Sequence, residues 1–246
     1  MLPTNSNQEI ATTILENVNI SENKEHNEVM TSNKLSDSNL EEGSFLYLST
    51  KRVFDILLSL IGMIILLPLF LIVAILIKKE DRHGPIFFKQ ERIGKNGKIF
   101  YMYKFRSMVS NAESLLETIL HLNEVEGAMF KIKSDPRITN IGKLIRATSI
   151  DELPQLWNVL KGEMSLVGPR PPLAREVEMY TDYEKQRLIV LPGCTGLWQA
   201  TERNNVGFKE MVELDLKYIR EKSLYFDIKI IIMTVFSLVI KRKSAF

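Results

Sequence analysis

The sequence has little of several residue types on which small or metal-built folds depend. One cysteine in 246 residues excludes a disulfide framework, because a single thiol cannot form an internal bridge. The three histidines lie in unrelated segments without the spacing of metal ligands, so no zinc site is expected. Twelve glycines and nine prolines are too few for a collagen-like or low-complexity chain. The length and the ordinary apolar content instead indicate one catalytic-sized domain with appendages.

The net charge is also small, +2 at pH 7, but it is unevenly distributed. Residues 1–50 carry −6 and the remaining 196 residues carry +8. A chain this close to neutral is not expected to bind nucleic acid. Residues 1–44 are rich in Asn, Ser, Thr and Glu and poor in apolar residues, which predicts a disordered acidic tail. No basic and apolar leader stands at Met1, so no cleaved secretory signal is expected.

The main hydrophobic feature is the run at 53–77, which contains one charged residue, Asp55. A straight helix of this length reaches about 37 Å, enough to cross a hydrocarbon core of roughly 30 Å. Basic residues flank both ends, however, and Pro68 lies inside the run, where it kinks a helix. These features favour a re-entrant helix-hairpin over 45–80 that enters from the cytoplasm, bends at Pro68 and returns to the same face. An ordinary kinked transmembrane helix is the alternative.

The rest of the chain, 81–246, is predicted to be a mostly helical α+β domain. Two β-rich runs, 86–90 and 99–106, enclose Asn96 and Gly97 and predict a β-hairpin. Helices are expected over 111–123, 141–147 and 208–222. The apolar segment 224–240 precedes three basic residues. It fits either an interfacial helix on an anionic leaflet or an amphipathic helix packed on the core.

The central candidate for chemistry is the carboxylate pair Asp151 and Glu152. Ser149 with Glu152 forms a capping box, which predicts a helix from this point to about residue 160 and also has a purely structural explanation. Asp151 then lies in the first turn, where the helix dipole keeps a carboxylate ionised and able to attack phosphorus. Adjacent residues on a helix diverge, so separate roles are predicted: one carboxylate attacks and the other holds Mg²⁺.

A second candidate is Arg170, which is framed by Pro169, Pro171 and Pro172. Prolines stiffen the turn and fix the direction of the guanidinium, which binds phosphate bidentately. The glycine-containing loop at 192–196 can bring backbone amides close to an anion. Lys104 and Arg106 are candidates for steering a phosphate near the membrane surface, against the alternative that they are merely solvated.

Six motifs occur in order between about residues 51 and 238. They are RVFD (52–55), GPIFFKQ (84–90), KFRSM (104–108), TSIDELPQ (148–155), SLVGPRP (165–171) and TGLWQ (195–199). With these motifs the chain resembles the bacterial sugar transferase family, the monotopic polyprenol-phosphate phosphoglycosyl transferases that begin capsule and exopolysaccharide assembly. The resemblance implies transfer of a sugar-1-phosphate from a UDP-sugar to undecaprenyl phosphate, with release of UMP and a phosphosugar held covalently on Asp151.

The resemblance also assigns roles to residues. It implies that Glu152 is associated with Mg²⁺, that Arg146 lies near the phosphates, and that the Arg170 turn lies near the nucleotide. The candidate substrate-binding residues are Arg146, Pro169, Arg170, Pro171, Lys104, Arg106, Gln155 and Arg203. The resemblance places the catalytic domain on the cytoplasmic leaflet of a bacterial cell membrane. The identity of the sugar, and whether the chain forms a homo-oligomer, stay open.

Two alternatives to this function stay open as well. The same substrates can react directly in a ternary complex, with Asp151 as a general base towards the lipid phosphate. The non-enzymatic alternative is a membrane-anchored scaffold or regulator of a polysaccharide assembly complex. It predicts no consumption of nucleotide.

Overall fold

The computed structural model describes residues 43–119, 132, 135–201 and 207–241, which all belong to the unit that begins at Glu41. The predicted acidic tail therefore lies outside the described residues except for Gly43 and Ser44. Ser44 is the N-cap of the first described helix, and its hydroxyl accepts a hydrogen bond from the backbone N–H of Tyr47.

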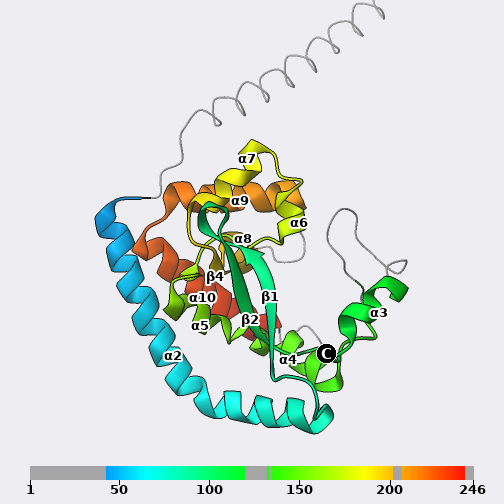
Figure 1. The fold of residues 1–246 in the computed structure, drawn as a ribbon. Helices are drawn as coiled ribbons and strands as arrows, with labels where there is room; N and C mark the ends of the chain where they lie inside the picture. Colours follow the sequence, from blue (N-terminus) through cyan, green and yellow to red (C-terminus); the bar gives the residue numbers. More distant parts are fainter. Residues whose placement is uncertain (1–42, 120–131, 133–134, 202–206, 242–246) are drawn as a thin grey trace, which may run out of the picture. The chain divides into compact units, whose positions relative to one another are not determined.

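The described part of the chain is mostly helical, as predicted, and contains the predicted hairpin together with a second small sheet that was not predicted (Figure 1). In chain order the elements are α2 (Phe45–Glu80), β1 (Phe87–Ile93), η1 (Lys95–Gly97), β2 (Ile99–Phe105), α3 (Ala112–Ile119), α4 (Asn140–Ala147), η3 (Ile150–Glu152), α5 (Gln155–Lys161), β3 (Ser165–Val167), α6 (Ala174–Val177), α7 (Asp182–Lys185), η4 (Gln186–Ile189), β4 (Gly193–Thr195), α8 (Leu197–Thr201), α9 (Phe208–Glu221) and α10 (Leu224–Lys241).

Strands β1 and β2 form the predicted antiparallel hairpin, with Phe88 opposite Lys104 and Ile93 opposite Ile99. Asn96 and Gly97 both have positive φ, 55° and 76°, the conformation that a tight Asn-Gly hairpin turn requires. β1 continues to Ile93, beyond the predicted end at residue 90. Directly opposed residues share a face of the sheet, so Phe88 and Lys104 project from the same side of the hairpin.

The second sheet pairs two short parallel strands that are distant in the sequence. Ser165 of β3 lies opposite Gly193 of β4, and Val167 lies opposite Thr195. This pairing brings the loop after β3, which contains Arg170, next to the glycine-containing loop at 192–196. The approach is so close that a Cβ atom on Gly193 would lie 2.1 Å from the backbone nitrogen of Gly168. Only glycine fits there.

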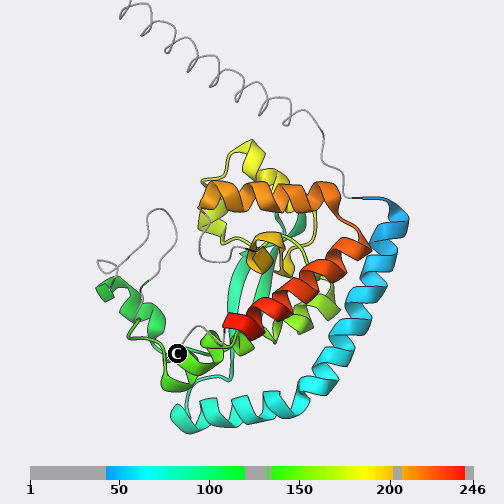
Figure 2. The ribbon, with the colours of Figure 1, turned by 180° about the vertical axis from the view of Figure 1, so that it is seen from behind.

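Helix α2 is one continuous helix of 36 residues, and Figures 1 and 2 show that it changes direction partway along. Pro68 lies inside it, where the missing N–H removes a backbone hydrogen bond and favours a bend. Two separate antiparallel arms are not seen. Among the described residues, α2 alone is long and apolar enough to cross a membrane. Its exposed apolar side chains include Leu57, Leu60, Ile61, Ile64, Ile65, Leu67, Leu71, Ile72 and Ile75.

The N-terminal part of α2 is bound to the rest of the unit by polar contacts. The Arg52 guanidinium donates to the carbonyls of Val159 and Leu160 at the end of α5, at 2.6 and 2.8 Å. The buried Asp55 carboxylate accepts from the Leu166 N–H of β3 at 3.1 Å. Charged donors on helix C-terminal carbonyls satisfy groups that the helix itself leaves unpaired.

The C-terminal part of α2 packs on the same unit through apolar side chains. Val73 and Ile77 form a buried cluster with Phe105 at the end of β2 and with Ile145 of α4. The Glu80 carboxylate adds two hydrogen bonds from the N–H groups of Asn140 and Ile141, at 2.7 and 3.0 Å. A carboxylate at a helix N-terminus is favoured by the free amides and the dipole.

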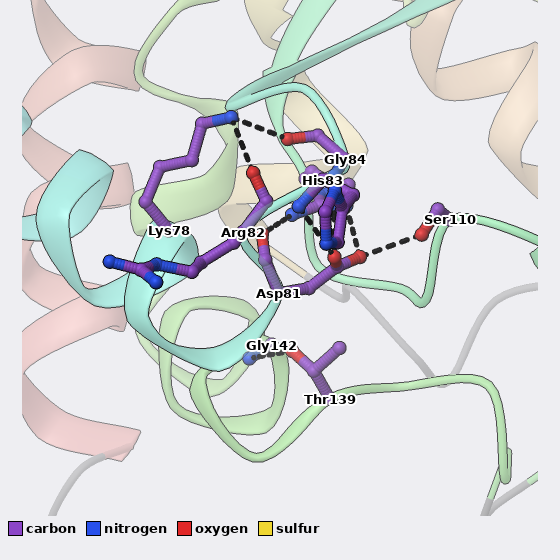
Figure 3. A network of polar contacts seen from close by, with 9 residues as sticks. Lys78, Asp81, Arg82, His83, Gly84, Ser110, Thr139 and Gly142 are labelled. Carbon is purple, nitrogen blue, oxygen red and sulfur yellow. Dashed lines mark hydrogen bonds and ion pairs between the residues drawn. The ribbon is translucent and has the colours of Figure 1, made fainter.

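A polar network closes the junction between α2 and β1 (Figure 3). The Asp81 carboxylate accepts hydrogen bonds from the Ser110 hydroxyl and the Arg106 guanidinium, both at 2.6 Å. The backbone N–H groups of His83 and Gly84 donate to its other oxygen. These donors, above all the Ser110 hydroxyl, hold the pKa of Asp81 well below its usual range. Both ends of α2 are therefore held by one and the same unit.

The bounds of helices α9 and α10 agree closely with the segments predicted from the sequence. The prediction of a helix over 208–222 is confirmed by α9. α10 buries Asp227 and Ile230 against the unit, which confirms the core-packing alternative for that face. Tyr225, Ile232 and Phe236 are exposed, so its opposite face is apolar and uncovered.

Candidate functional site

Asp151 and Glu152 lie in the 3₁₀ turn η3, just before α5. The prediction of a capping box at Ser149 is wrong: Ser149 has φ 56° and its side chain makes no capping hydrogen bond. Two physical reasons account for this. Pro154 has no N–H to continue a helix from Ser149, so α5 begins at Gln155. The Glu152 carboxylate, which a capping box needs, is bonded to Lys104 instead.

The Asp151 carboxyl group is buried, with 8% of the residue exposed. Burial raises its pKa to about 6; the neighbouring Glu152 charge adds to this rise, and Lys104 and Arg146 oppose it. The predicted helix start is a single 3₁₀ turn, η3, and burial works against the ionised form that the sequence predicts for Asp151. With a pKa near 6, about nine-tenths of the group is ionised at pH 7. A more basic carboxylate is also a better nucleophile.

Glu152 forms an ion pair with Lys104 of β2, with 2.6 Å between Oε1 and Nζ. Burial acts to raise the pKa of Glu152, but the positive charges of Lys104 and Arg170 outweigh it, so the pKa is lowered. Burial likewise lowers the pKa of Lys104, and Glu152 opposes that shift. The adjacent carboxylates thus have opposite pKa shifts, an arrangement that suits separate roles.

A pocket lies beside this pair, and both Glu152 and the Arg170 loop line it. The lining residues are Met102, Glu152, Gln155, Arg170, Pro171, Gly193, Cys194 and Gln199. Four of them, Glu152, Gln155, Arg170 and Pro171, are predicted site residues from segments that the fold brings together. Acidic and basic groups meeting in a concave site are typical of binding to a charged ligand.

Four consecutive backbone carbonyls anchor the Arg170 segment. Those of Pro169, Arg170, Pro171 and Pro172 accept hydrogen bonds from the Gly193 N–H at 2.8 Å, the Arg187 Nη2 at 3.5 Å, the Arg92 Nη1 at 2.8 Å and the Ile93 N–H at 3.0 Å. Prolines have no N–H, so these carbonyls are the groups that can fix the segment. The Gly193 amide is engaged in this way, and Gly193 and Cys194 line the pocket, so the approach of the loop's other amides to an anion stays a prediction.

The remaining predicted residues divide into three cases. Arg146 ends α4, and its charge acts on the Asp151 carboxyl group. Arg106 is not brought to Asp151 and Glu152, because its guanidinium is ion-paired with Asp81 at the end of α2. Arg203 lies outside the described residues.

Two buried arginines near the site have no sequence signal. Arg92 is 6% exposed and binds Gln90 and the Pro171 carbonyl. Arg187 pairs with the buried Asp215 of α9 and donates to the Tyr180 hydroxyl at 3.0 Å. The Pro171 carbonyl is 79 positions from Arg92, and Asp215 is 28 positions from Arg187. No local pattern marks contacts at such separations.

Comparison with known proteins gives consistent results. The model of a family described as "Bacterial sugar transferase" matches residues 46–241. "Galactosyl transferase CpsE" of Streptococcus agalactiae is 51% identical over 77% of this chain and 42% of the relative. "Undecaprenyl-phosphate galactose phosphotransferase" of Salmonella typhimurium is 43% identical over 80% and 41%. "Exopolysaccharide production protein ExoY" of Rhizobium meliloti is 39% identical over 79% and 87%. The chain spans about two-fifths of the length of the first two relatives.

Proposed function

The chain belongs to the bacterial sugar transferase family, and from this premise we propose that it transfers galactose-1-phosphate from UDP-galactose to undecaprenyl phosphate and releases UMP. The observation that carries the proposal is the pocket lined by Glu152 and Arg170. Glu152 is ion-paired with Lys104, and its sequence neighbour Asp151 is a buried carboxyl group with a raised pKa. Galactose is proposed because the names of relatives 43–51% identical to this chain specify it. The reaction would be the first membrane step of capsule or exopolysaccharide assembly.

In the first half-reaction, an Asp151 carboxylate oxygen attacks the phosphorus that bears the sugar. A carboxyl-oxygen-to-phosphorus bond forms, and the bond from that phosphorus to the bridging oxygen breaks. The electron pair leaves with UMP, and galactose-1-phosphate remains on Asp151 as an acyl phosphate. Burial and a pKa near 6 support this role, because the carboxylate is both ionised and poorly solvated at pH 7.

In the second half-reaction, a phosphate oxygen of undecaprenyl phosphate attacks the same phosphorus. The bond to Asp151 breaks, the carboxylate is regenerated, and undecaprenyl diphosphate galactose is released. Lys104 and Arg170 face the charge that moves between the oxygens in both steps. Positive groups held in place before the reaction stabilise such charge without reorganisation. The anchored carbonyls of the Arg170 segment support that role, because they limit the movement of its backbone.

The residues present fit a Mg²⁺ ion. Among the described residues no three His, Cys, Asp or Glu side chains are grouped to hold a metal. Mg²⁺ does not need such a group, because it commonly takes one or two carboxylates and completes its shell with water and substrate phosphates. Glu152 lines the pocket and is about a third exposed, so it would hold the ion. The chemistry that bound Mg²⁺ supplies is neutralisation of charge on the diphosphate.

Chelation is expected to lower the rate of UMP release at least about a hundredfold, and added Mg²⁺ to restore it. Glu152→Gln should raise the Mg²⁺ concentration for half-maximal rate about tenfold, because the ligand loses its charge. Glu178→Gln, on the exposed end of α6, is the control and should leave this value unchanged. A full rate in excess EDTA would contradict the assignment.

We also propose that α2 is re-entrant and that the catalytic unit lies on the cytoplasmic leaflet. Arg52 near its start and Glu80 at its end bind the same unit, whereas many of the apolar side chains between them are exposed. A helix that crossed the bilayer would place its two ends on opposite sides. Contact of both ends with one unit, together with the bend and the basic flanks, supports entry and return on one face.

Single-cysteine proteins test this topology in a Cys194→Ser background. Phe45→Cys and His83→Cys lie at the two exposed ends of α2, and Asp182→Cys reports the side of the catalytic unit. An impermeant maleimide should label all three in inside-out vesicles and none in intact cells. Labelling of Phe45→Cys and His83→Cys from opposite sides would establish a transmembrane helix instead.

The direct test of function is nucleotide release by the detergent-purified protein with Mg²⁺, undecaprenyl phosphate and a panel of UDP-sugars. UMP formed with UDP-galactose, in excess over the other sugars, is the expected result. UDP as the product would indicate ordinary glycosyl transfer and overturn the mechanism. Absence of any nucleotide product in a folded preparation would favour the scaffold alternative.

A further inference from the structure

Arg92 is buried, and its contacts orient its guanidinium towards the Arg170 segment. Its Nε and Nη2 atoms both donate to the Gln90 Oε1 atom, at 3.3 and 2.7 Å. This two-point contact leaves Nη1 directed at the Pro171 carbonyl, at 2.8 Å. A guanidinium is planar, so two contacts on one edge fix the direction of its other donors.

The backbone beside Arg92 strengthens the same attachment. The N–H of Ile93 donates to the Pro172 carbonyl at 3.0 Å, so two neighbouring residues of β1 bind two neighbouring prolines. The Arg170 side chain, which immediately precedes these prolines, faces the pocket that Glu152 and Gln155 also line. The position of Arg170 therefore depends on β1, a strand that contributes no lining residue to the pocket itself.

The charge of Arg92 also acts in this pocket. Burial lowers the pKa of Arg92 to about 10, and the positive charge of Arg170 adds to that shift. Arg92 therefore stays protonated at pH 7. Like charges held together cost free energy unless an anion lies between or beside them. Glu152 offsets part of the repulsion, and a bound diphosphate supplies the rest of the negative charge.

We propose that Arg92, oriented by Gln90, is a positioning residue that fixes the direction of Arg170 towards the diphosphate of the nucleotide sugar. This inference rests on the proposed function for the identity of the ligand. The two strands of the hairpin act on different lining residues: Lys104 of β2 pairs with Glu152, and Arg92 of β1 binds the segment that carries Arg170.

Kinetics of three variants test the proposal against a matched control. Arg92→Lys keeps the charge but cannot span Gln90 and Pro171, and Gln90→Leu removes only the orienting acceptor. Each should raise the KM for UDP-galactose about tenfold and also lower kcat, because Arg170 is proposed to face the diphosphate both in the bound substrate and in the transition state. Arg92→Met should raise KM further. Lys89→Leu, on the opposite face of the same strand, should leave both values unchanged.

Equilibrium binding separates positioning from turnover. In an Asp151→Asn background, isothermal titration with UDP should show about tenfold weaker binding for Arg92→Lys and Gln90→Leu than for the background protein. A variant that lost its fold would lose kcat and the thermal unfolding transition together; Gln90 is only half-buried, so its variant keeps the test available. Unchanged KM and UDP affinity in both variants would overturn the inference.

Failure of the proposed function has a different signature. If the unmodified protein releases no UMP from any UDP-sugar, the proposed function fails whatever the variants do. If it releases UMP but the Arg92 and Gln90 variants match the Lys89→Leu control, only the positioning role fails.

Discussion

Asp151→Asn is expected to lower UMP release by about a thousandfold or more, because an amide cannot form the acyl phosphate that the mechanism requires. The substitution keeps the shape of the side chain. It should also keep the fold, since burial raises the pKa of Asp151 to about 6 and the folded protein therefore already favours a neutral group at this position. UMP release measured with UDP-galactose and undecaprenyl phosphate gives the result directly.

The control for this substitution is Asp182→Asn. Asp182 is a fully exposed carboxylate on α7 that pairs with Lys185. It does not line the pocket, so its change should leave the rate unaltered. Retention of turnover by Asp151→Asn would exclude Asp151 as the nucleophile.

Labelling distinguishes the covalent mechanism from direct transfer. With the lipid left out, the parent protein should retain radioactive galactose-1-phosphate after denaturation, and Asp151→Asn should retain none. A ternary-complex reaction predicts no label on either protein, because Asp151 then acts only as a base towards the lipid phosphate.

Asp215→Ala is expected to destabilise the protein by about 3–5 kcal/mol, because it leaves the buried Arg187 without its counter-charge. Arg187 Nη1 also donates to Tyr180 and Nη2 to the Arg170 carbonyl, so loss of the Asp215 carboxylate also affects the Arg170 segment. In a domain of this size the corresponding fall in Tm is on the order of 10 °C. Thermal unfolding in detergent, followed by intrinsic fluorescence, measures it.

Two comparisons give this prediction its meaning. Asp182→Ala breaks an exposed ion pair with Lys185, and exposed pairs contribute about 0–1 kcal/mol. The double variant Asp215→Leu with Arg187→Met removes both buried charges and should be closer to the parent than Asp215→Ala is, since no unpaired charge remains. An equal effect of Asp215→Ala and Asp182→Ala would show that the buried pair is not a structural support.

The features that could be predicted share one property: each is marked by residues that are contiguous in the sequence. Asn96-Gly97 specifies a turn through its own backbone preference, and the density of prolines around Arg170 specifies a stiff segment. The apolar run at 53–77 is long enough to be recognised from composition alone. The carboxylate pair was found because Asp151 and Glu152 are adjacent.

The errors arise where a distant residue competes for a local group. The capping box at Ser149 depends on the Glu152 carboxylate, and Lys104, 48 positions earlier, takes that carboxylate in a charge-assisted contact. Arg106 has the type and place of a phosphate ligand, yet Asp81, 25 positions away, binds its guanidinium. A charged partner brought near by the fold outweighs a neutral cap.

Residue types and local patterns were thus enough to specify the apolar helix, the hairpin, the mostly helical class and the chemical character of the site. They could not specify which charges meet. Whether a carboxylate is buried, as Asp151 is, and which carbonyl a guanidinium such as that of Arg92 reaches, depend on segments tens of residues apart. Burial and long-range pairing set the strength of electrostatic interactions, and both exist only once the chain has folded.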